Sequence, residues 1–121
     1  YSPLAHPRTA GTFSRVLGKY VREERVISLN EAIEKMTLIP AKRLENIAPM
    51  MRFKGRIQVG ADADITIFNP LTISDQASFE QGLKFSAGIE HVLVNGELVL
   101  KNGKTLNNVF AGQPVYGRFK K

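Results

Sequence analysis

The strongest constraint on the fold is the segment 89–100, in which two β-rich runs flank the dipeptide Asn95-Gly96. Asn-Gly between such runs is the strongest short-range signal for a hairpin, because a type I′ turn needs positive φ at both of its central residues. The segment therefore predicts strands over Ile89–Val94 and 97–100 that are joined by this turn. Asn102-Gly103 predicts another turn directly after the hairpin.

A further strand is predicted upstream, over Ile65–Phe68, where β-branched and aromatic residues follow one another. Asp62-Ala63-Asp64 leads into this run, and Asn69-Pro70 ends it. Residues 56–59 are interpreted as one more short strand. Residues 71–87 carry only a weak pattern, so the sequence predicts no regular element there.

The first third of the chain has helical periodicity. Residues 1–9 are expected to form a loop, because Pro3 and Pro7 lack a backbone donor and restrict their neighbours. Residues 13–23 then predict a helix with Thr12 as its N-cap, since apolar side chains recur at helical spacing. These side chains are Phe13, Val16, Leu17, Tyr20 and Val21.

Two more helices are expected before residue 46. Ser28 and Glu31 have the spacing of a capping box, in which each side chain bonds to the backbone amide of the other residue. Pro40 suits the first turn of a short helix over residues 40–45, because its missing N–H would have no partner there. Helices that precede strands are typical of the α+β class.

The length of the chain limits what it can contain. Its 121 residues suit one small domain and are too few for a (β/α)8 barrel, which needs roughly 200 residues or more. With 43% hydrophobic and 8% aromatic residues the composition is globular. No apolar run approaches the ~18 residues of a membrane span, and the first four residues do not resemble a signal peptide. The chain lacks cysteine and does not start with Met, so we expect a cytoplasmic protein and a chain that begins inside a longer one.

The net charge of +6 raises the question of a nucleic-acid partner. Only residues 118–121 form a short basic tail, and the other basic residues are scattered. Scattered charges of this kind are usually solvated, so we expect neither a nucleic-acid nor a membrane partner. The scattered residues include Arg8, Arg15, Lys19, Arg22, Arg25, Lys35, Lys42, Arg43, Lys54 and Arg56.

Two carboxylates and two histidines are the candidates for metal or acid–base chemistry. Asp62 and Asp64 could share one face of an extended segment and bind a cation, but acidic residues at a Gly-containing turn usually bond to local amides. We favour this structural interpretation. His6 and His91 are the only histidines, and a zinc site needs three or four protein ligands. No complete metal site is therefore expected in this chain.

His6-Pro7-Arg8 is a candidate binding motif of another kind. Arg8 follows a rigid proline in a loop that leads into a helix, and a guanidinium is the side chain best suited to two-point binding of a carboxylate. The alternative is a surface arginine in a frayed terminus. The residue pattern alone favours this alternative.

The segment that carries His6-Pro7-Arg8 and Gly11-Thr12-Phe13 resembles the barrel-closing segment of the N-acyl-D-amino-acid deacylases, or D-aminoacylases. Family members share a motif close to His-Pro-Arg, two variable residues and Gly-Thr-Phe, and a helix follows it. Segments 54–70 and 88–100 resemble the closing strands of amidohydrolases in general. The similarity runs from residue 6 to about residue 103, and its first part is specific to the D-aminoacylase branch.

The resemblance implies a fold as well as a family. Residues 1–46 would be the helical end of an amidohydrolase (β/α)8 barrel, that is its last loop and helices. Residues 47–121 would be the C-terminal part of the small composite β-sandwich domain. The missing N-terminal part of the same protein would complete both and would be the main partner of this chain. On its own the chain would expose strand edges and apolar helix faces, and it could self-associate.

The resemblance also implies the chemistry. The whole enzyme would hydrolyse an N-acyl-D-amino acid, with a barrel-bound zinc that polarises the amide and lowers the pKa of its water. An Asp at the end of the eighth barrel strand would transfer the proton. That Asp and the metal ligands would precede this sequence, so no catalytic residue and no bound metal are implied here, and the chain alone would be inert. Arg8 would bind the α-carboxylate of the substrate, and His6 would shape the same loop.

Two other functions stay open at this point. A different amidohydrolase, for example a cyclic amidase such as a dihydroorotase or hydantoinase, would share the closing strands, although Gly11-Thr12-Phe13 after His6-Pro7-Arg8 argues against it. A free-standing basic binding module would explain the charge. The sequence does not identify the D-amino acid, the acyl group or the number of metal ions.

Overall fold

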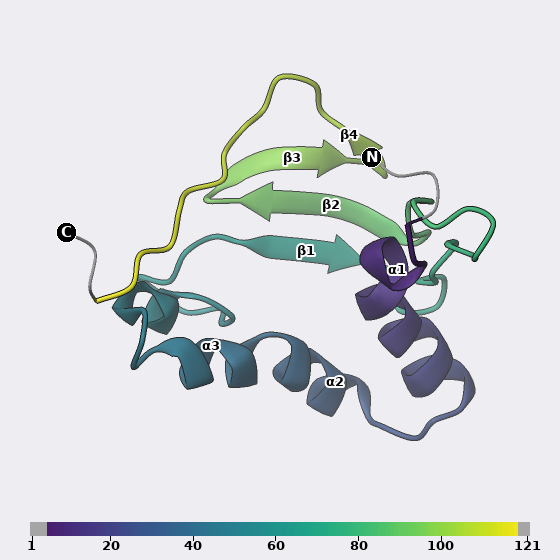
Figure 1. Ribbon diagram of the computed structural model, residues 1–121, viewed down its shortest axis with the longest axis horizontal. Coiled ribbons are helices and arrows are strands. Elements are labelled where there is room, and N and C mark those ends of the chain that lie inside the picture. The colour runs from purple at the N-terminus through teal and green to yellow at the C-terminus, as the bar shows by residue number, and fades with distance from the viewer. Residues whose placement is uncertain (1–4, 119–121) are drawn as a thin grey trace. The chain divides into compact units, whose positions relative to one another are not determined.

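The computed structural model describes residues 5–118, which form helices followed by a small sheet (Figure 1). The predicted α+β class is confirmed. Part of the predicted N-terminal loop, residues 1–4, and most of the basic tail, residues 119–121, lie outside the described residues. None of the helices among the described residues is both long enough and apolar enough to cross a membrane.

The first helix begins earlier than the sequence predicts. Helix α1 (Arg8–Arg15) continues without a break into a π-helical stretch, η1 (Val16–Glu23). Pro7 already has helical angles, φ −51° and ψ −31°, so the helix can begin directly after it. The prediction that Thr12 is the N-cap is therefore wrong, because Thr12 lies inside α1 and its hydroxyl donates to the Arg8 carbonyl at 2.6 Å.

The capping box is confirmed at the start of α2 (Leu29–Met36). The Glu31 carboxylate accepts from the Ser28 N–H at 3.1 Å and from the Ser28 hydroxyl at 2.7 Å, and the Glu31 N–H donates to the Ser28 hydroxyl oxygen at 3.3 Å. Helix α3 (Leu38–Leu44) follows after Thr37, and Pro40 lies in its first turn as predicted. A short 3₁₀-helix, η2 (Pro49–Phe53), comes next.

The sheet of the described residues has four strands in the order β1 (Ile65–Phe68), β2 (Ile89–Val94), β3 (Glu97–Lys101) and β4 (Lys104–Thr105). Strands β2 and β3 are antiparallel, and the last residue pair before the turn is Val94 with Glu97.

Both predicted turns are confirmed. Asn95 and Gly96 have φ values of 51° and 83°, and Asn102 and Gly103 have φ values of 51° and 73°. These positive φ values are what a two-residue type I′ turn requires at both central positions.

The short strand predicted over residues 56–59 is wrong. This segment pairs with no strand among the described residues, and the side chains of Ile57 and Val59 are 90% and 103% exposed. The Arg56 guanidinium instead donates to the Lys54 carbonyl and pairs with Glu45. Apolar β-formers do not form a strand where no neighbouring strand and no apolar surface receives them.

The described part of the chain divides into two compact units. One consists of Tyr1–Ala32 and Ile67–Glu90, and the other of Ile33–Thr66 and His91–Lys121. Leu17 and Ile73 are buried in the first unit, and Ala41 and Ala111 are buried in the second. The boundary predicted between residues 46 and 47 concerns the domains of the whole protein and stays a prediction.

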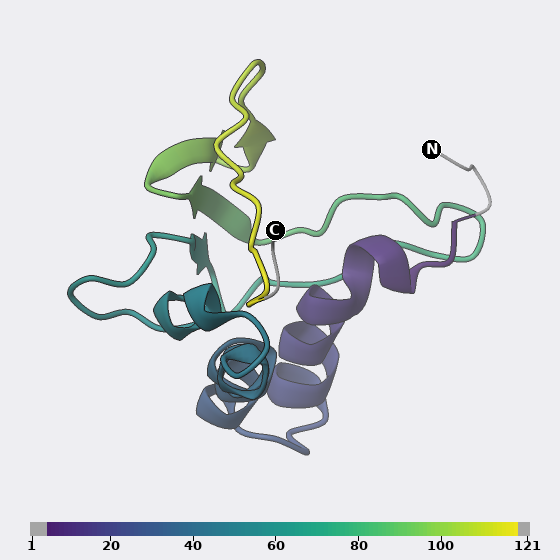
Figure 2. The ribbon, with the colours of Figure 1, turned by 60° about the vertical axis from the view of Figure 1, so that its left-hand side comes forward.

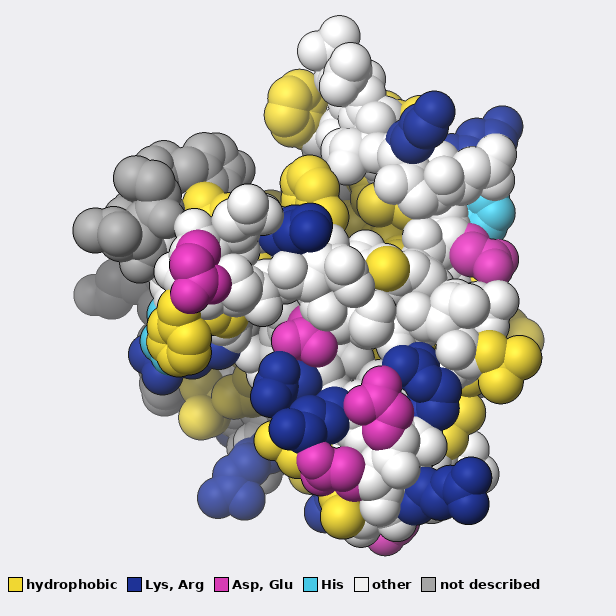
Figure 3. Space-filling view, turned by 90° about the vertical axis from the view of Figure 1, so that its right-hand side faces the viewer, with side chains coloured by type: hydrophobic (Ala, Val, Ile, Leu, Met, Phe, Trp, Pro, Cys, Tyr) yellow, Lys and Arg dark blue, Asp and Glu magenta, His cyan; other side chains and the backbone are white. Residues whose placement is uncertain are grey.

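Figure 3 shows how charged side chains are distributed over one face of the molecule. On the face drawn in Figure 3, basic and acidic side chains are intermixed, and hydrophobic side chains lie between them. Several large apolar side chains of the described residues are exposed, among them Phe13, Leu71, Phe79, Phe85 and Phe110.

Candidate functional site

The candidate site is built on the segment 71–88, which we call the strap. In Figures 1 and 2 the strap leaves β1, passes the N-terminal half of α1 and returns to β2. Its first part is fixed to η1, because the Arg22 guanidinium donates to the Ile73 carbonyl at 2.5 Å and Ile73 is only 2% exposed. Gly18 permits this approach, since a Cβ at that position would lie 2.6 Å from the Ile73 carbonyl oxygen.

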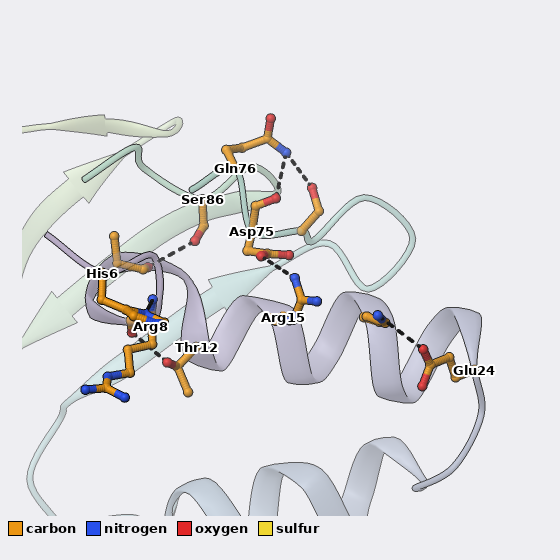
Figure 4. A network of polar contacts seen from close by, with 11 residues as sticks. His6, Arg8, Thr12, Arg15, Glu24, Asp75, Gln76 and Ser86 are labelled. Carbon is orange, nitrogen blue, oxygen red and sulfur yellow. Dashed lines mark hydrogen bonds and ion pairs between the residues drawn. The ribbon is translucent and has the colours of Figure 1, made fainter. Parts of the chain in front are cut away.

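The next part of the strap is fixed to α1 by an ion pair. The Arg15 guanidinium donates to the Asp75 carboxylate at 3.1 Å (Figure 4). The hydrogen bond to Asp75 is the main cause that raises the pKa of Arg15 above its usual value. Gly11 allows the close approach, because a Cβ there would lie 2.8 Å from the Asp75 Cβ. Further along, the Ser86 hydroxyl donates to the Ala10 carbonyl at 3.5 Å.

A cavity of about 550 Å³ lies between α1 and the strap. The α1 side contributes Arg8, Gly11, Thr12 and Arg15, which share one helix face because they are spaced by three or four residues. The strap side contributes Asp75 and residues 77–80. Val16, Tyr20 and Pro7 add apolar surface, so the cavity combines an apolar wall with a few charged groups.

Arg8 lines this cavity, together with His6. Its backbone N–H donates to His6 Nδ1 at 3.2 Å, and its carbonyl accepts from Thr12. Among residues 5–118 no acidic side chain pairs with the Arg8 guanidinium, which in Figure 4 extends away from the Arg15–Asp75 pair. Arg8 is thus one of the residues that line the cavity, and no acidic side chain of the described residues pairs with its guanidinium.

The strap contributes two further side chains to the lining of the cavity, Phe79 and Glu80. The Phe79 ring meets the His6 ring edge to face, with centroids 5.2 Å apart and an interplanar angle of 77°. The Glu80 carboxyl accepts a hydrogen bond from the Ser78 hydroxyl, which lowers the pKa of Glu80 below its usual value.

Asp62 and Asp64 have a structural role, as favoured above, but their shared partner is the Lys54 ammonium group rather than a local amide. Lys54 Nζ lies 2.9 Å from an Asp62 oxygen and 2.6 Å from an Asp64 oxygen. The other Asp64 oxygen accepts the Asn95 N–H at 2.8 Å, which fixes the hairpin turn. The hydrogen bond from Lys54 is the main cause that lowers the pKa of Asp64, and the same contact raises the pKa of Lys54.

The residues present do not fit a zinc site. No group of three or more His, Cys, Asp or Glu side chains within residues 5–118 is placed to hold a metal ion. His6 contacts Phe79, and the half-buried His91 accepts the Asn102 N–H through Nδ1 at 3.4 Å.

Sequence reasoning identified His6 and Arg8 as a candidate pair but missed the side chains opposite them. Asp75 and Phe79 lie in the weakly patterned segment, and the Arg15–Asp75 contact joins residues 60 positions apart. No spacing rule connects such distant residues. The weak pattern of residues 71–87 gave no signal that would have identified them.

Comparison with known proteins agrees with the resemblance. N-acyl-D-glutamate deacylase from Alcaligenes xylosoxydans xylosoxydans is 48% identical over 91 residues, which are 75% of this chain and 18% of that protein. A crystal structure of D-aminoacylase has a TM-score of 0.82 at 36% identity, over 91% of this chain and 22% of that one.

A second solved structure is similar as well. The N-acyl-D-glutamate deacylase from Bordetella bronchiseptica, complexed with zinc and a phosphonate that mimics the tetrahedral intermediate, has a TM-score of 0.72 at 39% identity. The match covers 83% of this chain and 21% of that one. The chain thus spans about a fifth of the relatives it matches, and D-hydantoinases are more distantly similar to it. Because its residues 2–100 match the model of the amidohydrolase family, the chain belongs to this family.

Proposed function

We propose that this chain is the C-terminal part of a zinc-dependent hydrolase that cleaves the amide bond of N-acyl-D-amino acids. Its similarity to deacylases of such substrates supports this, and one of those relatives contains zinc. In this proposal residues 1–46 complete the barrel and residues 47–121 contribute to the β-sandwich domain. The exposed apolar side chains of both parts would then be covered by the rest of the protein.

The observation that carries the proposal for this chain is the guanidinium of Arg8, which has no acidic partner among the described residues. Arg8 is one of the residues that line a cavity with an apolar wall, and within residues 5–118 no carboxylate pairs with its guanidinium. An N-acyl-D-amino acid offers a carboxylate next to an apolar acyl chain. Arg8 would bind that α-carboxylate with charge-assisted hydrogen bonds, and His6 would shape the loop that presents it.

The role of this chain is binding and orientation rather than bond cleavage. No group of metal ligands gathers within the described residues, so the zinc ligands and the proton-transferring carboxylate would come from other parts of the protein. Holding the α-carboxylate fixes the position of the scissile amide relative to those groups. Orientation of this kind lowers the entropic part of the barrier without any chemistry by the arginine itself.

The test is a kinetic comparison in the whole protein, with N-acyl-D-amino acids as substrates and their L-enantiomers and a cyclic amide as alternatives. Arg8→Ala should lower kcat/KM by about ten- to a few-hundred-fold, because charge-assisted hydrogen bonds contribute roughly 1.5–3 kcal/mol. Arg8→Lys should recover only part of this loss, since an ammonium group lacks the planar fork. Zinc content should be unchanged in both variants.

Arg43→Ala is the matched control, because Arg43 is an exposed helical arginine without an acidic partner among the described residues. It should keep the wild-type kcat/KM. Full activity of Arg8→Ala would show that Arg8 is a surface residue, and a preference for the cyclic amide would favour a cyclic amidase instead.

A further inference from the structure

The contact between Phe79 and His6 connects the strap directly to Arg8. The Phe79 ring packs edge to face against His6, and His6 Nδ1 accepts the backbone N–H of Arg8. Because it accepts this hydrogen bond, Nδ1 must be unprotonated. The orientation of the imidazole therefore decides whether the first residue of α1 keeps this hydrogen bond.

Phe79 is carried by a segment that is fixed on both sides. Before it, Asp75 pairs with Arg15, and after it, Ser86 bonds to the Ala10 carbonyl. Between these anchors Gly82 comes so close to Ala5 that a Cβ would lie 1.6 Å from the Ala5 carbonyl oxygen. The strap thus contacts residues on both sides of the His6-Pro7-Arg8 motif at three points. These contacts restrict the movement of Phe79 relative to His6.

Burial within the described part of the chain does not account for an aromatic residue at this position. Phe79 is 75% exposed, so the described part of the chain gains little hydrophobic stabilisation from it. Its specific contact is with the ring of His6. An edge-to-face pair has a defined geometry, so it can select one orientation of the imidazole.

We propose that Phe79 is a positioning residue for substrate binding: its contact with His6 holds the Arg8 hydrogen bond and keeps the guanidinium directed at the substrate carboxylate. This inference rests on the proposed role of Arg8. Without Phe79 the loop would occupy more conformations, and only a fraction of the molecules would present Arg8 correctly. The apparent affinity for substrate is then the intrinsic affinity multiplied by that fraction.

The experiment measures steady-state kinetics of the whole protein on an N-acyl-D-amino acid. Phe79→Ala should lower kcat/KM by about two- to twelve-fold, the range that corresponds to an aromatic pair. The loss should appear as an increase in KM with kcat nearly unchanged, because the interaction acts equally on bound substrate and transition state. Phe79→Tyr keeps the ring and should keep the wild-type KM.

Phe85→Ala is the matched control, since Phe85 lies on the same strap, is 85% exposed and does not line the cavity. It should leave KM unchanged. The decisive measurement is a double-mutant cycle. In an Arg8→Ala background, Phe79→Ala should change kcat/KM by less than twofold, because the group that it positions is gone.

Two results would overturn the inference while leaving the role of Arg8 intact. In the first, Phe79→Ala keeps the wild-type KM although Arg8→Ala does not. In the second, Phe79→Ala has the same effect with and without Arg8, which would indicate a general structural role. Full activity of Arg8→Ala would instead contradict the proposed function, so the two failures are distinguishable.

Discussion

Replacement of Gly18 by alanine tests how closely the strap packs on η1. Gly18 is buried, and an added Cβ would lie 2.6 Å from the Ile73 carbonyl oxygen and 3.3 Å from the Ser74 Cα. Cβ atoms essentially never approach other heavy atoms closer than 3.0 Å, so the backbone must separate by at least the difference of 0.4 Å. The oxygen that would be displaced is the one that accepts from Arg22.

Three effects decide the outcome of Gly18→Ala. Alanine is the better helix former by about 1 kcal/mol, which favours the variant. Overpacking typically costs 1–3 kcal/mol, and weakening the part-buried hydrogen bond from Arg22 adds roughly 1.5 kcal/mol. The unfavourable effects are larger, so we expect Gly18→Ala to lower the free energy of unfolding by about 2–3 kcal/mol.

Urea and thermal unfolding followed by circular dichroism measure this difference. At roughly 4 °C per kcal/mol for a chain of this size, Tm should fall by about 8–12 °C. Gly112→Ala is the control, because a Cβ there meets no atom within 4 Å, and it should be neutral or slightly stabilising. If Gly18→Ala were as stable as the wild type, the close packing of the strap on η1 would be refuted.

Two predictions concern the hairpin. Gly96→Val should lower the free energy of unfolding by at least about 1 kcal/mol, because φ at this position is +83°, and an unchanged melting curve would contradict the type I′ turn. Asp64→Asn should cost about 1 kcal/mol at pH 7, since it removes the charge that pairs with Lys54. Because the pKa of Asp64 is lowered in the fold, its contribution is complete above the unfolded pKa of about 4 and disappears as pH falls through the folded pKa. The stability difference from the wild type should therefore shrink below about pH 4, and a difference that is constant down to pH 2 would exclude the ion pair as its cause.

The elements that could be predicted are those that local sequence determines. Asn95-Gly96 needs only its own backbone preference to form the turn, and Ser28 and Glu31 satisfy each other within one helical turn. The predictions that failed depended on context. Residues 56–59 have the composition of a strand, but the Arg56 side chain bonds to the Lys54 carbonyl and the segment pairs with no strand of the described residues. The start of α1 depended on the helical ψ of Pro7, which the residue type does not determine.

The candidate site also has a part that local sequence determines and a part that depends on tertiary contacts. The motif His6-Pro7-Arg8 was recognisable in the sequence, whereas the strap that faces it had no pattern. Its position is determined by glycines that permit close approach, such as Gly11 and Gly18, and by an ion pair across 60 residues. Such contacts follow from the tertiary structure and have no periodicity of their own.

The two Asn-Gly turns also have a kinetic consequence. Strands β2, β3 and β4 pair through two-residue connections, so this part of the sheet closes with very short loops. Hairpins of this kind form within microseconds, whereas contacts between residues far apart in the chain must first overcome the entropy of closing a long loop. The bonds from the strap to α1 and η1 join residues 51–76 positions apart. We therefore expect the cavity lined by Arg8 to assemble late, after these strands have paired.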